Sequence, residues 1–390
     1  MSNNRVGVFF SHLDYCLLGA LALVMLYQCY FYLRYMTGVA RWKRKHSAQP
    51  PVADVDLPKV SVIVCARNEQ TNLSDYLHTL LAQDYPCYEV IVVNDGSEDN
   101  TQQVLEQYAQ QYNNLYVTFV PREARVLSSK KLALTIGIKA AHYDYLLLTD
   151  ADCRPESRQW IREMMSAFVR GGEQTEVVLG YGAYFEKNTW LSSIINYDTL
   201  FIALQYMGMA AARHPYMGVG RNLAYKKDTF FQHDGFRGML NERSGDDDLF
   251  VNKVTNRGNT AIVGSRDSIT WSPPKMTWQE WIHQKRRHLS VSHHYKTSSK
   301  LRLGLEPMTR GLLYALLIAV SIWGSGMAIG IAYGLWWLRL IMQMSVINTT
   351  AYRLGGRLFG IEIVAYDIVL PLISLWILAT QRLHKRPIYW

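Results

Sequence analysis

Two aspartates one residue apart follow a short apolar run in the stretch YLLLTDADC, residues 145–153. A continuous apolar run such as residues 145–148 is typical of a strand buried on both faces of a parallel sheet. Because open α/β sheets bind ligands at the carboxyl edge of their strands, Asp150 and Asp152 are expected at such a site. Neighbouring carboxylates repel each other unless a cation lies between or beside them, and Mg²⁺ or Mn²⁺, which can hold a diphosphate, prefers such oxygen ligands. The stretch therefore indicates a metal site, and the simpler alternative is two solvated loop aspartates before a turn at Pro155.

A second acidic cluster, Asp246, Asp247 and Asp248, follows Gly245 at the expected start of a helix. Its simpler explanation is that carboxylates at a helix start complement the helix dipole. Crowding of like charges also raises the pKa of at least one carboxyl group, which favours a proton acceptor.

A basic run, QKRRH at residues 284–288, lies in a predicted amphipathic helix over residues 278–295 that begins with Trp278 and Trp281. Such a run can hold an anionic group of a ligand. Its alternative is a basic face on acidic lipid, and both can hold together because side chains on one helix face different ways.

The elements that must position these side chains alternate along the chain. Strands are predicted over residues 60–65, 88–93 and 116–120, with helices over 73–83 and 130–141 between them and the next strand. Strands that alternate with helices predict a parallel α/β sheet of nucleotide-binding type. The sequence contains neither G-x-G-x-x-G nor a P-loop, which counts against dinucleotides and ATP hydrolysis of the Walker type.

Polar residues follow the predicted strands where a nucleotide can lie. Asp95 can accept a hydrogen bond from a base N–H, and Asn68 with Glu69 can hold base or ribose. Lys130 can reach a phosphate as a point charge. Each residue alone is better explained as a turn or surface residue, so the prediction depends on their joint occurrence at successive strand ends.

The motifs VSVIVCARNE, VNDGS, SKKLAL, TDAD, GDDDLF and QKRRH occur in this order over residues 59 to about 300. Together they resemble family 2 glycosyltransferases of the GT-A fold, in the group of processive polysaccharide synthases and ceramide glucosyltransferases. The resemblance implies an α/β GT-A domain with a mostly parallel sheet and transmembrane α-helices at both ends of the chain. It also implies that the donor is a UDP- or GDP-sugar, with UDP favoured, and that Mg²⁺ or Mn²⁺ is the cofactor.

By this resemblance, Lys130 lies beside the nucleotide, while Asp150 and Asp152 face the ribose and the metal-bound diphosphate, with Asp152 as the main metal ligand. The nucleotide-sugar pocket is then lined by Ala66, Arg67, Asn68, Glu69 and Asp95.

The family's acidic pair, usually Glu-Asp, aligns best with Asp246 and Asp247, which makes Asp247 the base that deprotonates the acceptor. Because Asp248 is also acidic, the alignment of the family's acidic pair with this cluster can shift by one residue. Gln284 would position donor or acceptor, and Arg287 would neutralise the leaving diphosphate. His288 stands where processive synthases have a Trp that stacks on the acceptor sugar, and an imidazole stacks less well than an indole. The departure favours single transfer over chain elongation.

The apolar segment over residues 13–35 exceeds the roughly 20 residues needed to span a bilayer. Since no small-residue cleavage site follows it, we expect a retained anchor rather than a signal peptide. The basic run RWKRK at residues 41–45 then places the following domain in the cytoplasm and the amino terminus outside, in an inner (plasma) membrane of the cell envelope. The expected division is an anchor over 1–40, a basic linker over 41–58, the catalytic domain over 59–300 and membrane or interfacial helices over 301–390.

The carboxyl-terminal apolar segments raise a conflict of topology. Residues 308–347 predict a two-helix hairpin broken by Gly324, Gly326 and Gly330, with Arg339 facing an interface, a partner or a cavity. Residues 361–379, which contain Asp367 and Pro371, predict another span. Three spans after a cytoplasmic domain would place Arg382, Lys385 and Arg386 outside, against the charge rule. Either one segment is interfacial or re-entrant, or these charges are tolerated.

Two segments in the middle of the chain are expected to shape the acceptor side. Residues 190–212 predict an apolar helix that either rests on the membrane interface or belongs to the core. Residues 218–222, GVGRN, predict a flexible turn.

The charge and the cysteine content of the chain indicate which kinds of partner and compartment to expect. The 390 residues carry a net charge of +9, with basic residues gathered around the apolar ends, a pattern that favours an anionic membrane surface over nucleic acid. The five cysteines show no C-x-x-C spacing, so neither a disulfide framework nor a zinc site is expected. We therefore expect the soluble part of the chain to lie in a reducing compartment.

The leading hypothesis is therefore an inverting, metal-assisted transfer of one sugar to a membrane-associated lipid or glycan acceptor. The first alternative is a processive polysaccharide synthase that exports its product through its own spans. The second is a catalytically silent membrane scaffold that retains the fold, against which the presence of all acidic positions argues.

Overall fold

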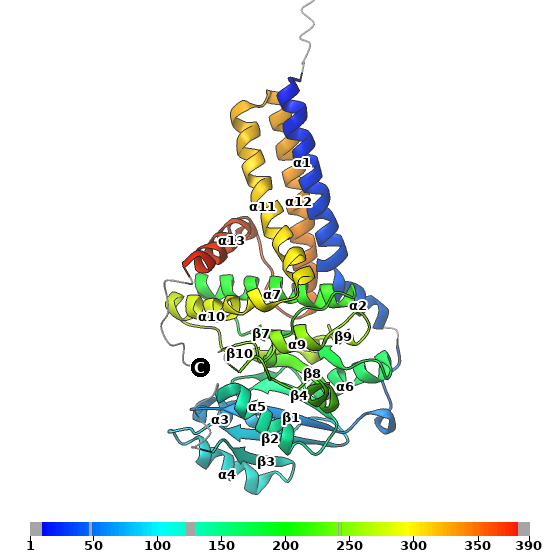
Figure 1. Cartoon of the computed structure of the whole chain (residues 1–390), viewed down its shortest axis with the longest axis vertical. Helices are drawn as coiled ribbons and strands as arrows, with labels where there is room; N and C mark the ends of the chain where they lie inside the picture. The colour runs from blue at the N-terminus through cyan, green and yellow to red at the C-terminus, as the bar shows by residue number, and fades with distance from the viewer. Residues whose placement is uncertain (1–9, 47–48, 122–128, 241, 243, 381–390) are drawn as a thin grey trace, which may run out of the picture.

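The computed structural model describes residues 10–46, 49–121, 129–240, 242 and 244–380. Figure 1 shows three long helices standing as a bundle on an α/β domain, with the helix α7 lying across the junction. The bundle consists of α1 (His12–Phe31), α11 (Thr297–Trp323) and α12 (Gly326–Arg353).

Seven strands form the main sheet in the order β3-β2-β1-β4-β8-β6-β9. The first four are parallel to one another, while β8 pairs antiparallel with both β4 and β6, and β6 pairs parallel with β9. The sheet is thus mostly parallel, as the sequence predicted. Its strands are β1 (Val60–Ala66), β2 (Tyr88–Asn94), β3 (Leu115–Phe119), β4 (Tyr145–Asp150), β6 (Val177–Leu179), β8 (Leu223–Lys226) and β9 (Thr260–Ile262).

Alternating residues of β1 and β4 enter two different cores, because successive side chains of a strand point to opposite faces. Val62 and Leu147 pack with the helices on one face, and Ile63 and Leu148 pack with those on the other. The prediction that the apolar run before Asp150 is buried on both faces is therefore confirmed. The covering helices are α3 (Gln70–Leu81), α4 (Thr101–Gln111) and α6 (Trp160–Gly171) on the first face, and α5 (Ser129–Ala140) and α7 (Trp190–Ala211) on the second.

The remaining elements lie between the main sheet and the helices that lead to the bundle. A small sheet joins β5 (Arg154–Pro155), β10 (Thr270–Ser272) and β7 (Gly182–Tyr184). Short helices α8 (Lys227–Gln232) and α9 (Asp248–Val254) precede the longer α10 (Trp278–Ser290).

Helix α7 is a core helix. Its buried residues run from Leu191 to Ala210 and occur on all sides of the helix, whereas Trp190 at its start is exposed. Of the two alternatives for residues 190–212, the structure bears out the core helix. Its apolar side chains pack against β7, β9 and the helices of the bundle instead of facing solvent.

The predicted hairpin is present with different bounds. Helix α11 begins eleven residues earlier than position 308, at Thr297, and α12 starts at Gly326 after the N-cap Ser325. Gly330 lies inside α12 and does not interrupt that helix. The backbone N–H of Ser325 donates a hydrogen bond of 2.9 Å to the carboxylate of Asp14, which ties the hairpin turn to the start of α1.

Among the described residues, four helical segments are long and apolar enough to cross a membrane: His12–His46, α11, α12 and α13 (Glu362–Thr380). Figure 1 shows that α13 leaves the bundle and lies beside α7 and α10 instead. It is therefore placed differently from the other three.

Backbone contacts join the first helical segment to α7. After α1 the chain makes a π-helical turn, η1 (Tyr32–Met36), and continues as α2 (Gly38–His46). A Cβ atom at Gly208 would lie 1.8 Å from the carbonyl oxygen of Tyr35, and one at Gly38 would lie 2.4 Å from the Cα atom of Gly208. Both positions require glycine because the two backbones touch.

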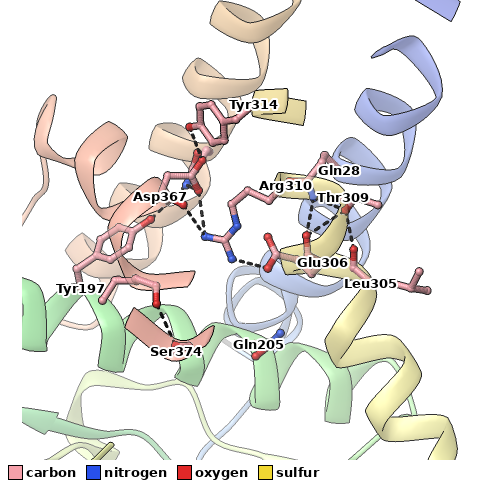
Figure 2. A network of polar contacts seen from close by, with 12 residues as sticks. Gln28, Tyr197, Gln205, Leu305, Glu306, Thr309, Arg310, Tyr314, Asp367 and Ser374 are labelled. Atoms are coloured by element: carbon pink, nitrogen blue, oxygen red, sulfur yellow. Dashed lines mark hydrogen bonds and ion pairs between the residues drawn. The ribbon is translucent and has the colours of Figure 1, made fainter. Parts of the chain in front are cut away.

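A buried polar network fixes α13 to the base of the bundle (Figure 2). Asp367 accepts hydrogen bonds from Arg339 at 2.8 Å and Arg310 at 3.1 Å, and Arg310 also pairs with Glu306. Gln28 of α1 accepts from Arg339 at 3.0 Å. We call Glu306, Arg310, Arg339 and Asp367 the bundle-base cluster; its charges balance.

Candidate active site

The parallel strands bring their polar ends to one edge of the sheet. In the register of the sheet, Ala66 at the end of β1 pairs with Asn94 of β2, and Cys65 pairs with Asp150 of β4. The backbone N–H of Asp95 donates to the carbonyl oxygen of Ala66 at 2.8 Å, which brings Asp95, a buried residue, next to the end of β1.

The loops after β1 and β2 are tied together at this edge. Asn68 has a left-handed backbone, with φ of 57°, and its side-chain oxygen accepts from the backbone N–H of Glu98 at 2.8 Å. The backbone N–H of Glu69 donates to the hydroxyl of Thr101 at 2.9 Å. Burial, followed by the charges of Asp152 and Asp150, raises the pKa of Glu69. The residues predicted to surround a nucleotide thus lie together, with exposed Arg67 between Ala66 and Asn68.

The two acidic motifs, far apart in sequence, meet beside one lysine. The Lys130 Nζ atom lies 3.0 Å from a carboxylate oxygen of Asp150 and 3.4 Å from one of Asp246. A small cavity of about 10 Å³ beside them is lined by Asp150, Asp246, Asp247 and Gly220, among others. We call Asp150, Asp152, Asp246, Asp247 and Asp248 the acidic cluster.

The three consecutive aspartates occupy three different environments. Burial alone would raise the pKa of Asp246, but Lys130 and Lys131 outweigh it and lower that pKa. Asp247 accepts backbone hydrogen bonds from Gly220 and Asp248, both at 2.8 Å, and burial and Asp246 raise its pKa. Asp248 is buried, accepts from the hydroxyl of Tyr295 at 2.8 Å, and has its pKa raised to about 8 by burial and by Asp247. Asp247 alone of the three combines a raised pKa with a place on the cavity wall.

Asp152 lies beside an arginine that sequence reasoning did not single out. Burial and the charge of Asp150 raise the pKa of Asp152, and Arg221 opposes them. The guanidinium of Arg221 lies 4.1 Å from the ring centre of Tyr184 and donates to the carbonyl oxygen of Gly182 at 2.8 Å. Arg221 is therefore held rigidly between the two acidic motifs and β7.

The segment that contains Arg221 corrects the expectation of a flexible turn. Gly220–Asn222 forms a short 3₁₀ helix, η4, in front of β8. Asn222 is fully buried, and its side chain donates to the carbonyl oxygens of Tyr181 and Ser268. The sequence offered only a weak signal for Asn222, because its hydrogen-bond partners Tyr181 and Ser268 are distant in the chain.

Helix α10 carries the basic run to the same site. Gln284 donates to the hydroxyl of Tyr184 at 2.8 Å, and Lys285 forms an ion pair of 2.7 Å with Asp198 of α7 that fixes the helix. Arg287 helps to lower the pKa of Asp246, so it lies near the acidic cluster. His288 is an exposed residue of α10, and loss of hydration and the charges of Arg287 and Arg221 lower its pKa.

Oxygen ligands for a divalent cation are available at this edge. Among the described residues, no group of three or more His, Cys, Asp or Glu side chains is arranged to hold a metal ion. Mg²⁺ needs fewer, since it is usually bound through one or two carboxylates together with substrate phosphates and water. In the part of the chain that the structure describes, Lys130 pairs with Asp150 and Asp246 but not with Asp152. Asp152, with Asp150 beside it, therefore fits a cation brought in with a diphosphate.

Comparison with known proteins was made for the whole chain. Residues 61–242 match the model of "Glycosyl transferase family 2". A probable glycosyltransferase, YdaM, of Bacillus subtilis is 25% identical over 264 residues, which cover 66% of this chain and 58% of that protein. A poly-beta-1,6-N-acetyl-D-glucosamine synthase of Staphylococcus epidermidis is 33% identical over 93 residues, 24% of this chain and 21% of that protein. The alignments thus span less than two thirds of either relative.

The mannosyltransferase PcManGT from Pyrobaculum calidifontis, solved with GDP-Man and Mn²⁺, has a similar structure. It is 19% identical, with a TM-score of 0.59 over 96% of this chain and 99% of that one. The two chains share a fold that includes the helices outside the α/β domain.

Proposed function

Since the chain belongs to glycosyl transferase family 2 and has the predicted GT-A fold, we propose that it transfers a sugar, with inversion, from a nucleoside-diphosphate sugar to a membrane-associated lipid or glycan. The observation that carries the proposal is the meeting of Asp150 and Asp247 on one small cavity beside Lys130. A UDP-sugar is the favoured donor. A GDP-sugar is the second choice, because the similar mannosyltransferase was solved with GDP-Man.

Asp247 is the proposed base that accepts the proton of the attacking hydroxyl. Asp246 is a weaker candidate because its ion pair with Lys130 lowers its pKa. Asp248 is buried beneath Tyr295 and cannot reach a substrate. Asp247 remains, since its carboxylate lines the cavity and burial raises its pKa, which makes it a stronger proton acceptor than an ordinary aspartate.

The leaving nucleoside diphosphate needs positive charge. Asp152, with Asp150, is the proposed ligand of Mg²⁺ or Mn²⁺, which when bound neutralises charge on the diphosphate. The buried Nε atom of Arg287 has no hydrogen-bond acceptor among the described residues, so it is available to a phosphate oxygen. Gln284, held by Tyr184, is placed to orient the donor or the acceptor.

The placement of α13 supports one alternative for the topology conflict, in which the last apolar segment is interfacial. We assign α1, α11 and α12 as the spans and α13 as a helix on the domain side of the bilayer, because it lies beside α7 and α10. With the amino terminus outside, two spans after the domain return the chain to the cytoplasmic side. Arg382, Lys385 and Arg386 lie outside the described residues; on this assignment the chain reaches them from the cytoplasmic side, as the positive-inside rule favours.

Hydrolysis and transfer of labelled nucleotide sugars by the purified chain in detergent tests the proposal. We expect release of nucleoside diphosphate from one donor of the panel, dependent on Mg²⁺ or Mn²⁺. Asp152→Asn should weaken metal-dependent donor binding, whereas Asp247→Asn should keep donor binding and lose transfer. If no nucleotide sugar is bound or cleaved at any metal concentration, the proposal is wrong.

Chain elongation is the second candidate function, favoured by the 33% identity to a polysaccharide synthase over 93 residues. The presence of His288, a poorer stacking surface than Trp, favours single transfer. The size of the labelled product on a gel separates the two, since a polymer migrates as a ladder or a smear.

A further inference from the structure

A second, larger cavity of about 260 Å³ lies between the small sheet and the connection from α12 to α13. One wall consists of Tyr184 at the end of β7, Phe185 directly after it and Trp271 on β10. The opposite wall is formed by residues 354–359, among them Arg357 and Phe359. No residue of the acidic cluster lines this cavity, so it is separate from the donor site.

The cavity is built from fixed parts. The rings of Phe185 and Trp271 are stacked, with centres 6.1 Å apart and planes 18° from parallel. Phe359 on the opposite wall is held by two backbone hydrogen bonds with the side chain of Asn348, at 2.7 and 2.8 Å. Gly355 has φ of 68°, which a residue with a side chain would adopt only with strain. The shape is therefore present before any ligand binds.

The chemistry of the walls fits a neutral, hydroxylated ring. Aromatic faces offer a flat apolar surface, while Asn196 and the charged side chains offer hydrogen bonds, the mixture found in small-ligand sites. The lining carries two guanidinium groups, Arg154 and Arg357, and two carboxylates, Glu156 and Glu186, so it has no surplus of positive charge for a phosphate. An acyl chain would remove water from Arg154, which forms no ion pair among the described residues. The volume is just below the roughly 300–1,000 Å³ of sites for drug-sized ligands, which suits a single sugar ring.

The cavity communicates with the reacting groups through one residue. Tyr184 lines the cavity, and its hydroxyl accepts a hydrogen bond from Gln284. The guanidinium of Arg221 lies over its ring. A sugar that contacts Phe185, whose ring packs on Trp271 and under the guanidinium of Arg154, therefore lies one side chain away from the donor site. The wall formed by residues 354–359 also connects two helices of the membrane part, so the cavity lies on the side from which a membrane-bound acceptor arrives.

We propose that this cavity binds a neutral sugar of the acceptor, so that the acceptor is a glycan, free or lipid-linked, and not a bare lipid alcohol or lipid phosphate. This inference rests on the proposed glycosyltransferase function and adds the class of acceptor.

Alkyl glycosides test it with the full chain in detergent and the donor that the chain hydrolyses. The probes are octyl glucoside, octyl mannoside and octyl N-acetylglucosaminide. Transfer of label to each of them is compared with transfer to decanol and to decyl phosphate. We expect label to enter at least one glycoside and neither of the other two. Phe185→Leu, which keeps apolar volume and removes the ring face, should raise the KM for that glycoside about tenfold while the KM for the donor stays within twofold.

Two variants complete the design. Phe185→Tyr should restore the wild-type KM because it restores the ring, which excludes a mere folding defect. Phe119→Leu is the matched control, since Phe119 is an exposed aromatic residue on the outermost strand β3, and it should change neither KM.

Label in decyl phosphate or decanol alone would overturn the inference, as would an unchanged glycoside KM in Phe185→Leu. Donor hydrolysis with transfer to none of the three glycosides would also overturn it and leave the proposed function standing. Absence of donor hydrolysis in the wild type would instead overturn the function itself.

Discussion

Two clusters of buried charge in this molecule are organised in opposite ways. In the bundle-base cluster two carboxylates face two guanidinium groups, and Asp367 and Glu306 each pair with an arginine. In the acidic cluster five carboxylates gather, and Lys130 forms ion pairs with only two of them. The first cluster pairs each carboxylate with an arginine, whereas among the described residues three carboxylates of the second, Asp152, Asp247 and Asp248, form no ion pair.

The difference indicates different tasks. Buried charges persist in a stable structure when they are paired and hydrogen-bonded, and removal of one partner leaves an uncompensated charge. Surplus charge, by contrast, destabilises the chain alone and is relieved when a cation or a proton arrives. The balanced cluster therefore fixes helices, while the unbalanced cluster is prepared for a ligand. Four predictions follow the contrast from the largest effect to the smallest.

Asp247→Asn should lower the rate of sugar transfer by roughly 10²–10⁴-fold, the usual contribution of a general base. The melting temperature should stay close to that of the wild type, because the amide keeps only one of the two hydrogen bonds accepted from Gly220 and Asp248 but also removes a negative charge beside Asp246. Initial rates and thermal unfolding in detergent measure both effects.

The pH profile of the wild type sharpens this prediction. Since the pKa of Asp247 is raised, activity should decline with falling pH at a higher pH than an ordinary aspartate would give. Normal turnover of Asp247→Asn would remove Asp247 from the role of base.

Asp367→Ala should destabilise the fold by about 3–5 kcal/mol, because it leaves Arg339 buried without a carboxylate partner. Chemical unfolding in detergent measures the loss. The double variant Arg339→Met with Asp367→Leu removes both charges and should recover most of the stability. A single variant as stable as the wild type would mean that the bundle-base cluster does not hold α13.

Asp248→Asn should abolish a pH dependence of stability. The folded pKa of Asp248, about 8, lies above the unfolded value near 3.9, so the folded state favours the protonated form. This contribution is complete below the unfolded pKa and is lost as pH rises through about 8. Melting temperatures at pH 6 and pH 9 should differ in the wild type and differ less in the variant. An equal difference in both proteins would contradict the assignment.

Trp376→Leu should have the smallest effect, about 0.5–1 kcal/mol. The guanidinium of Arg286 on α10 lies 5.7 Å from the ring centre of Trp376 on α13, within the range of a cation–π contact. Trp323→Leu is the matched control, since Trp323 is an exposed tryptophan at the far end of α11. Equal shifts of the melting temperature in the two variants would argue against the contact.

Local patterns were sufficient for the parts of the fold that depend on neighbouring residues. The buried run before Asp150 and the helix start at Asp248 follow from apolar continuity and from turn residues, and both lie where they were expected. Arg221 was not identified because its position depends on β8, which enters the sheet antiparallel between β4 and β6. No local pattern reports that order of strands.

The membrane part shows the same limit. Length and glycines predicted the hairpin of α11 and α12, but the separate placement of α13 depends on Asp367 meeting Arg310 and Arg339 from two other helices. The sequence indicated that the charge of Arg339 needs a partner, but it did not identify that partner. The single Asp within the apolar segment 361–379 was the available signal.

The contact at Gly208 fixes the distance between α7 and the first helical segment. There α7 meets the first helical segment backbone to backbone, with no side chain between them whose rotamer could adjust the spacing. With the bundle in a bilayer, as proposed, the distance between the acidic edge of the sheet and the lipid headgroups would be constant. The proposed acceptor would then have to bridge that distance itself, so the number of atoms between its tail and its reactive hydroxyl would decide whether it is used.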